Sequence, residues 1–152
     1  MIAGYTGGVD SSPSFEDVST GKTGNIEAVK VFYQAKKISY KKLLDTYWRN
    51  IDPTRLNGQF TDEGPQFRTV IYFLDESQQA AAILSKQQLQ KSGRFGKGKP
   101  LVTEILQAME FHPAEKSHQD YFKKNSGRYH TYRLFSGRDK FFKHIWGAVP
   151  LD

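Results

Sequence analysis

The order of apolar and polar segments predicts an α+β fold, in which helices cover a β-sheet within one domain. Three observations carry this prediction. Strand-like and helix-like segments follow one another along the chain without an internal repeat. The 152 residues suffice for one compact domain but are too few for two, and 38% of them are hydrophobic, which is enough to build one core. We therefore expect a single domain over residues 1–152.

Three segments have the composition of strands. Residues 26–33 (IEAVKVFY) and 68–74 (RTVIYFL) are rich in β-branched and aromatic side chains, and residues 101–106 (LVTEIL) form a further short strand. Alternation along the first strand places Glu27 on one face with two valines. A carboxylate there can be solvated at a frayed strand start. Alternatively, it can be partly desolvated, with a raised pKa that suits it to donate a proton near neutral pH.

Helical patterns cover four segments. Residues 39–50 and 75–93 begin with a serine and an aspartate, which are good N-cap residues. Residues 113–125 begin with a proline, which suits the first turn of a helix, and residues 138–147 carry four apolar side chains that can share a face. Between these last two segments, residues 128–135 (RYHTYRLF) are predicted to be extended.

Polar loops, which we expect to be long and ordered, separate these elements. Residues 9–25 and 51–67 are rich in Gly, Ser, Pro, Asn and Asp. Ahead of them stands a glycine cluster, residues 4–8 (GYTGG), which permits a turn or the close approach of another backbone or a ligand. Ordered loops of this length are often functional, so the site is expected among them.

The positive charge of the chain is concentrated near its C-terminus. Between Lys123 and Lys143 lie seven Lys and Arg residues against Asp139 alone, and this difference equals the net charge of +6. Aromatic residues are interleaved with these charges, so the segment could bind nucleic acid through phosphate contacts and base stacking. Alternatively, the segment is the solvated face of a terminal element whose aromatic side chains pack inward.

Several classes of site are excluded or disfavoured by the sequence. The chain contains no cysteine, so it has no disulfide, thiolate metal site or cysteine nucleophile of its own. No metal is predicted, because the spacing of His112 and His118 does not suit helical ligands and no acidic cluster completes a site. His118 can equally be a hydrogen-bonded structural residue. No apolar run could span a bilayer and no targeting pattern opens the chain, so we expect no membrane association and, by default, a cytoplasmic protein.

Seven blocks of the sequence, in this order and spacing, resemble the A-type peptide methionine sulfoxide reductases, which reduce the S epimer of methionine sulfoxide. They are AGYTGG, TGKTGNIEAVKV, DPTRLN, DEGPQFRTVIY, SGRF, VTEI and PAEKSHQDY. The blocks make residues 3–122 the family-like core, and we interpret residues 123–152 as a basic, aromatic C-terminal extension. The resemblance implies a two-layer sheet, related to the ferredoxin-like arrangement, with helices over it.

The resemblance also implies roles for five residues. It implies that the Tyr5 hydroxyl binds the sulfoxide oxygen and that Glu27 protonates this oxygen. Asp62 would line the substrate pocket, with His118 near it, and Phe67 stands where the family usually has a second tyrosine, which removes one hydroxyl donor. No bound cofactor is implied. The substrate would be methionine sulfoxide, free or in proteins, and the partner an external thiol reductant, thioredoxin in the family or dithiothreitol in vitro.

One departure from the family pattern concerns the chemistry directly. The family's nucleophilic cysteine stands in a G-C-F-W block ahead of the glycine cluster, and this chain has no cysteine. We therefore expect an N-terminally truncated sequence that lacks the first strand and helix of the family fold, leaves apolar surface uncovered, is less stable and does not reduce sulfoxides by itself. Two alternatives remain open. One is a non-catalytic or degenerate family member that binds methionine-containing peptides, favoured by Pro65 and Phe67, and the other is a basic nucleic-acid-binding module.

Overall fold

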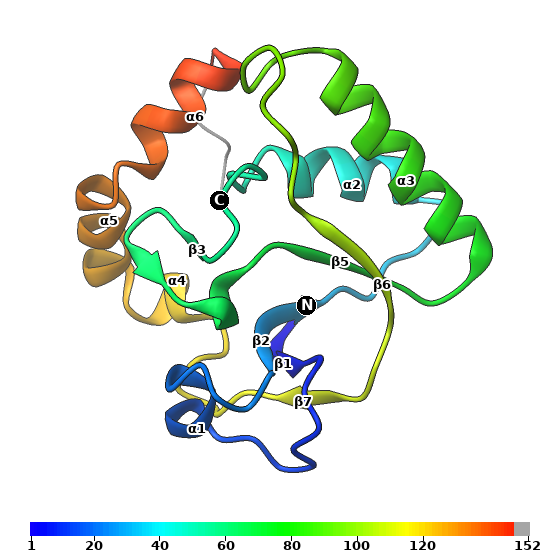
Figure 1. The fold of residues 1–152 in the computed structure, drawn as a ribbon. Coiled ribbons are helices and arrows are strands. Elements are labelled where there is room, and N and C mark those ends of the chain that lie inside the picture. The colour runs from blue at the N-terminus through cyan, green and yellow to red at the C-terminus, as the bar shows by residue number, and fades with distance from the viewer. Residues whose placement is uncertain (148–152) are drawn as a thin grey trace.

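A computed structural model of the chain describes residues 1–147 (Figure 1). Short strands and helices alternate along these residues. In chain order the elements are β1 Ile2–Thr6, α1 Phe15–Ser19, β2 Ile26–Lys30, α2 Tyr40–Trp48, β3 Gly58–Gln59, β4 Asp62–Glu63, the 3₁₀ turn η1 Pro65–Phe67, β5 Val70–Phe73, α3 Glu76–Lys91, β6 Glu104–Gln107, β7 Phe111–Pro113, α4 Tyr121–Lys124, α5 Ser126–Phe135 and α6 Arg138–Trp146.

The strands pair in three small sheets. The first has the order β2-β1-β7 and is antiparallel, the second is the antiparallel hairpin β3-β4, and the third pairs β5 with β6 in parallel. Helices α2 and α3 lie beside β5 and β6, whereas α4, α5 and α6 lie on the opposite side of the molecule, next to β3 (Figure 1). The α+β class is confirmed, and the sheet that we expected to be single is divided into three.

The main core lies where α2 and α3 meet the parallel strand pair. Its buried residues are Leu44, Trp48, Ile71 and Ala82. The indole N–H of Trp48 donates to the Ser85 hydroxyl at 3.0 Å, so α2 and α3 are joined by a hydrogen bond as well as by apolar packing. The amphipathic helix α2 and the alanine-rich helix α3 both turn apolar side chains toward this core.

Both predicted N-caps are confirmed. The Ser39 hydroxyl accepts the N–H of Lys42 at the start of α2, and the Asp75 carboxylate accepts the N–H of Gln78 at the start of α3. Gly93, with a φ of +62°, follows α3 and takes the left-handed conformation that glycine adopts at low cost. Local capping and apolar spacing therefore sufficed to place these two helices.

The predicted helix over residues 113–125 is wrong. Pro113 ends strand β7, which pairs with β1 in the register Gly4↔Pro113, and only the single turn α4 is helical. The side chain of Gln119 explains the difference: its carbonyl accepts the N–H of Ala3 at 2.9 Å and its amide donates to the Ala3 carbonyl at 2.8 Å. These long-range bonds to β1 hold the segment in turns and override its local helical preference.

The extended conformation predicted for residues 128–135 is also wrong, because these residues form most of α5. Helical spacing turns Tyr132 and Arg133 toward the rest of the protein, and Arg133 pairs with Asp139 of α6 at 2.6 Å. The predicted final helix is confirmed as α6, in which Phe142 is fully buried. The aromatic and β-branched composition of α5 resembles that of a strand, and tertiary contacts decide its conformation. We call α4, α5 and α6 the tail.

The glycine cluster packs against its own chain. Gly7 has a φ of +92°, and a Cβ atom at Gly8 would lie 2.5 Å from the Thr23 carbonyl oxygen and 2.6 Å from the Asn25 nitrogen. The Gly8 N–H donates to the Asn25 side chain at 3.1 Å. The glycines therefore allow the loop after β1 to lie against the residues that precede β2, and so bring the two strands together.

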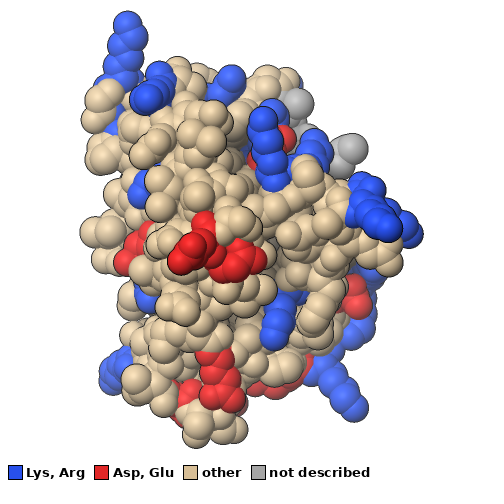
Figure 2. Space-filling view, turned by 90° about the vertical axis from the view of Figure 1, so that its right-hand side faces the viewer, with Lys and Arg blue, Asp and Glu red and all other residues tan. Residues whose placement is uncertain are grey.

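The surface combines uncovered apolar groups with dispersed charge. β2 is an edge strand of its sheet. Apolar side chains on and after β2 are exposed, including Val29 at 58% and Phe32 at 68%. On the face turned to the viewer in Figure 2, the right-hand side of Figure 1, basic and acidic groups are interspersed over a largely uncharged surface. Within residues 1–147, no helix combines the length and the apolar character that a membrane span needs.

Candidate active site

A pocket of ≈ 340 Å³ opens beside strands β1 and β2. It brings together three of the five predicted site residues, Tyr5, Glu27 and His118. Its lining comprises Ala3, Gly4, Tyr5, Phe15, Glu27, Ala28, Val29, Ala114 and His118. Titratable groups therefore share this pocket with small and apolar side chains, as in sites that bind a small polar ligand with an apolar part.

Tyr5 and Glu27 face each other across the β1–β2 pair. The antiparallel register pairs Tyr5 directly with Glu27, so the two side chains project from the same face of the sheet. Glu27 is an exposed residue on the open pocket, and neighbouring protein atoms desolvate its carboxyl only in part. This partial desolvation, followed by the negative charge of Asp62, raises the pKa of Glu27, and the nearby His118 opposes the shift. Glu27 is thus a carboxyl group inclined to hold a proton and accessible to a ligand.

Glu115 is the residue that sequence reasoning missed. Its carboxylate accepts the Tyr5 hydroxyl at 2.8 Å and the backbone N–H of Phe15 at 2.8 Å, and it lies 3.2 Å from Nδ1 of His118. The backbone N–H groups of Phe15 and of Glu115 itself, together with the Tyr5 hydroxyl and the charge of His118, lower the pKa of Glu115 to about 2. Burial and Glu115 together raise the pKa of the Tyr5 phenol, which stays protonated. The only signal in the sequence was the position of Glu115 within the PAEKSHQDY block, three residues before His118.

His118 fits both interpretations that the sequence left open. It lines the pocket, and its ring stacks on Phe15 with 4.6 Å between ring centroids while Nδ1 approaches Glu115. The residue lies in a turn ahead of α4 rather than on a helix. His118 is therefore at once a hydrogen-bonded structural residue and a wall of the pocket.

Asp62 and Phe67 lie outside the pocket lining. Asp62 begins β4, and its carboxylate accepts the hydroxyl of Tyr132 from α5. It acts on the pocket through charge, since it is the second cause of the raised pKa of Glu27. Phe67 ends the turn η1, which packs beside β2, and its contact with substrate stays a prediction.

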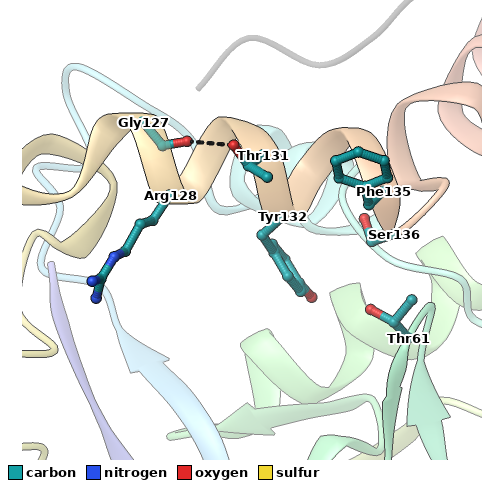
Figure 3. Close-up of a pocket in the computed structure, with 7 residues that line it drawn as sticks. All are labelled: Thr61, Gly127, Arg128, Thr131, Tyr132, Phe135 and Ser136. Carbon is teal, nitrogen blue, oxygen red and sulfur yellow. Dashed lines mark hydrogen bonds between the residues drawn. The ribbon is translucent and has the colours of Figure 1, made fainter.

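A second cavity, of ≈ 480 Å³, lies between α5 and the β3–β4 hairpin (Figure 3). Arg128 and Tyr132 extend from the same side of α5, and Thr61 of the hairpin lies across from them. Its lining residues are Thr61, Gly127, Arg128, Thr131, Tyr132, Phe135 and Ser136. This lining includes no carboxylate or imidazole, so acid–base groups are concentrated in the smaller pocket.

The arrangement defines a pocket that can bind and protonate an oxygen atom. A carboxyl group with a raised pKa can act as a general acid, and the protonated phenol that it faces can donate a hydrogen bond to the same oxygen. The residues that the structure describes hold no group of three or more His, Cys, Asp or Glu that could bind a metal ion. The sequence contains no cysteine, so no thiol of this chain lies in the pocket.

Comparisons with known proteins place this chain in a family of oxidoreductases. The family model for peptide methionine sulfoxide reductase matches residues 1–149, which includes the tail as well as the seven sequence blocks. The chain therefore belongs to the peptide methionine sulfoxide reductase family, whose function is the reduction of methionine sulfoxide.

Individual relatives agree with this assignment. The chain is 46% identical over 147 residues to the peptide methionine sulfoxide reductase MsrA of Halalkalibacterium halodurans, covering 97% of this chain and 82% of that protein. It is 45% identical over 145 residues to the enzyme of Bacillus licheniformis, covering 95% of this chain and 79% of that protein.

Solved structures agree as well. The reduced form of Mxr1 from Saccharomyces cerevisiae matches with a TM-score of 0.75 and 29% identity, over 82% of this chain and 70% of that chain. Methionine sulfoxide reductase A of Corynebacterium diphtheriae matches with a TM-score of 0.70 and 28% identity, over 82% of this chain and 63% of that chain.

Proposed function

We propose that this chain supplies the oxygen-binding and proton-donating part of a methionine sulfoxide reductase site, with Glu27 as the acid. The observation that carries the proposal is the pairing of Glu27 with Tyr5 in one pocket, where burial and Asp62 raise the pKa of Glu27. A sulfoxide oxygen is a poor leaving group until it is protonated, so a carboxyl whose raised pKa lets it hold its proton to a higher pH than an ordinary glutamate favours cleavage of the S–O bond.

The pocket also offers groups for the remaining parts of the substrate. The Tyr5 hydroxyl, which donates to Glu115 at 2.8 Å, can turn to the sulfoxide oxygen as a second donor. Phe15, Ala28 and Val29 supply apolar surface for the methyl end of the side chain. In this proposal the substrate is the S epimer of methionine sulfoxide, free or within a polypeptide.

The electrons come from a thiol outside this chain. A thiolate attacks the sulfur, the S–O bond breaks and the oxygen passes to the attacking sulfur, so that methionine and a sulfenic acid form. A second thiol then converts the sulfenic acid to a disulfide and releases water. Because the chain has no cysteine, we propose that by itself it binds the sulfoxide without reducing it. The attacking thiol has to be fixed in the site, and a thioredoxin-type protein or dithiothreitol is the proposed class of reductant that supplies the second thiol.

Titration calorimetry tests the binding step. We expect the S epimer of a methionine sulfoxide peptide to bind more tightly than the R epimer or unoxidised methionine. Binding should strengthen as the pH falls through the raised pKa of Glu27, because the protonated carboxyl donates a hydrogen bond to the sulfoxide oxygen. The affinity of Glu27→Gln for the sulfoxide should not depend on pH around the pKa of Glu27. Glu16→Gln, at an exposed carboxyl on α1, is the matched control and should behave like the original chain.

An activity assay with dithiothreitol tests the chemical step. We expect no sulfoxide reduction by the chain alone, because dithiothreitol lacks the positioning that a thiol fixed in the site provides. Reduction that depends on Glu27 would contradict the proposed need for a fixed external thiol. Equal binding of methionine and its sulfoxide would contradict the proposed oxygen-binding role and would favour a protein that binds methionine-containing peptides.

A further inference from the structure

We infer that Tyr132, on the tail helix α5, is a positioning residue of the candidate site, because its hydroxyl holds Asp62 in place beside Glu27. The inference deepens the proposed function and rests on it for the role of Glu27 as the acid. It changes the interpretation of the C-terminal segment, from an extension that follows the family-like core to a part that shapes the site.

Tyr132 of the tail and Asp62 of the β3–β4 hairpin form a hydrogen bond. The half-buried Tyr132 extends from α5 toward the β3–β4 hairpin, beside the cavity that it lines together with Thr61 (Figure 3). Its hydroxyl donates to the Asp62 carboxylate. Burial, followed by this bond, raises the pKa of the Tyr132 phenol, so the hydroxyl remains a proton donor at neutral pH. A single side chain thus connects two segments that lie 70 residues apart.

The tail also contacts the hairpin turn that carries Asp62. Phe60 adopts a φ of +58°, a left-handed conformation that is unfavourable for an aromatic residue unless surrounding contacts hold it. The tail supplies these contacts: the rings of Phe141 and Phe142 pack edge-on against Phe60, with 5.5 Å and 5.4 Å between centroids. The Arg138 guanidinium lies 4.7 Å from the Phe60 ring centroid. The tail therefore holds the turn from which Asp62 projects.

Arg138 joins these two sets of contacts. Besides covering Phe60, its guanidinium donates to the Tyr132 hydroxyl at 3.5 Å. The cation thus lies at the point where α5, α6 and the hairpin meet. Because both Tyr132 and Phe60 are fixed by neighbouring tail residues, the position of the Asp62 carboxylate is set by the tail rather than by the short β3–β4 pair alone.

The hairpin that carries Asp62 is joined to the strand of the acid through the turn η1, which follows β4 and packs beside β2. The charge of Asp62 is the second cause, after burial, of the raised pKa of Glu27, and His118 acts in the opposite direction. Without the Tyr132 hydroxyl, the Asp62 carboxylate loses its fixed donor and is free to turn toward water. Its repulsion of the Glu27 carboxylate then weakens, and Glu27 releases its proton more easily.

Titration of Glu27 by carbon NMR in the full chain, labelled at the glutamate side chains, tests the inference. We expect a downward shift of the Glu27 pKa in Tyr132→Phe and in Asp62→Asn, and no further downward shift when both are combined. Thr131→Val is the matched control, because its hydroxyl bonds only to the Gly127 carbonyl of its own helix, at 2.9 Å. This control should leave the Glu27 pKa unchanged.

Two outcomes would overturn the inference. One is an unchanged Glu27 pKa in Tyr132→Phe, and the other is a shift of equal size whether or not Asp62 is present, which would indicate a merely structural effect. If Tyr132→Phe does not fold, fluorine NMR of the chain labelled with 3-fluorotyrosine replaces it. The Tyr132 signal should then move in Asp62→Asn, and a signal that stays in place would overturn the inference. The titration uses neither sulfoxide nor thiol, so a failure of sulfoxide binding would contradict the proposed function separately.

Discussion

At the scale of single residues, Glu27 combines two properties that usually exclude each other. A ligand can reach its carboxyl through the open pocket, yet burial by surrounding protein atoms and the charge of Asp62 raise its pKa. A proton donor needs both properties, and the protein loses some stability by keeping a carboxylate there at neutral pH. Stability and chemistry should therefore respond in opposite directions to a change at this position.

Glu27→Gln should raise the free energy of unfolding at neutral pH. Because the pKa of Glu27 is higher in the folded state than in the unfolded chain, its contribution is most favourable below the unfolded pKa, about 4.3, and is lost as the pH rises through the folded value. Because a glutamine side chain does not ionise, the variant does not lose this stability as the pH rises. Urea unfolding of both chains at pH 7 and at pH 4 measures how much the free energy of unfolding rises in the variant. A rise at pH 7 that is no larger than the rise at pH 4 would contradict the raised pKa.

Glu115 should show the opposite pH dependence. Its pKa is lowered to about 2 by the N–H of Phe15 and by its other donors, so its stabilising contribution is present above the unfolded pKa and is lost as the pH falls toward 2. Glu115→Gln should therefore flatten the decline of stability between about pH 4.5 and pH 2. Urea unfolding over this range measures the slope. Glu16→Gln, which alters an exposed carboxylate outside the network, is the control, and an unchanged slope in Glu115→Gln would refute the proposed network.

Gly8 should not tolerate a side chain. A Cβ atom there would lie 2.5 Å from the Thr23 carbonyl oxygen and 2.6 Å from the Asn25 nitrogen, both of them backbone atoms that cannot move independently. We expect Gly8→Ala to lower the free energy of unfolding by about 2 kcal/mol. Gly127→Ala is the control, because a Cβ atom at this helical position meets nothing within 4 Å, and it should be neutral or stabilising by up to about 1 kcal/mol.

The site residues could be predicted only in part. Alternation placed Glu27 beside valines, but Val29 is 58% exposed and the raised pKa comes from general burial and from Asp62. The family-like motifs named Tyr5 and His118, which line one pocket with Glu27, and their roles toward the substrate stay predictions. Glu115 could not be predicted, since its partners are fixed by contacts across the chain, such as the bond from the Phe15 N–H 100 residues earlier.

At the scale of elements, the helices with local signals were predictable and those governed by distant contacts were not. Helix α3 has an aspartate cap, an alanine-rich middle and a glycine just after its end, and each signal is contained within the element. The segment after β7 and helix α5 lack such signals. Their conformations follow from the Gln119 bonds to Ala3 and from the packing of Tyr132 and Arg133, which no local pattern encodes.

The Asp75 cap should be worth a measurable part of the stability. Its carboxylate accepts the Gln78 N–H at 2.9 Å, while the Gln78 side chain accepts the Leu74 N–H at 3.0 Å. We expect Asp75→Ala to lower the free energy of unfolding by about 1 kcal/mol, because one of the first N–H groups of α3 loses its partner. Asp75→Ser, which keeps an acceptor, should retain most of the stability. Equal losses in both variants would show that the cap is not the cause.

At the scale of the whole molecule, the tail is part of the folded body. Phe142 is fully buried, and Trp146 of α6 packs against the main core between α2 and α3. The helices α5 and α6 curve around the hairpin on the left of Figure 1 and return toward the loop after α3. The aromatic residues of the tail therefore act mainly in packing, which agrees with the second of the two interpretations that the sequence left open.

This packing bears on the binding of nucleic acid. The side chains that would have to stack on bases are engaged: Phe141 and Phe142 pack on Phe60, and the Trp146 ring lies 4.5 Å from the guanidinium of Arg49 and 4.7 Å from that of Arg94. Several of the positive charges are also engaged within the protein, since Arg133 pairs with Asp139 at 2.6 Å. A positive net charge with few available aromatic groups supports at most weak attraction to phosphates.

We therefore expect no salt-dependent binding of the chain to generic duplex or single-stranded DNA near physiological ionic strength. Gel-shift titrations over a series of salt concentrations measure this, since binding through phosphates weakens steeply as salt rises. Phe135, with 78% of its surface exposed, is the aromatic residue of α5 most available for stacking. Binding that falls with salt and is lost in Phe135→Ala would assign the tail a nucleic-acid role. If binding falls with salt but persists in Phe135→Ala, its cause is the net charge alone, and increasing the salt should abolish it for every DNA sequence alike.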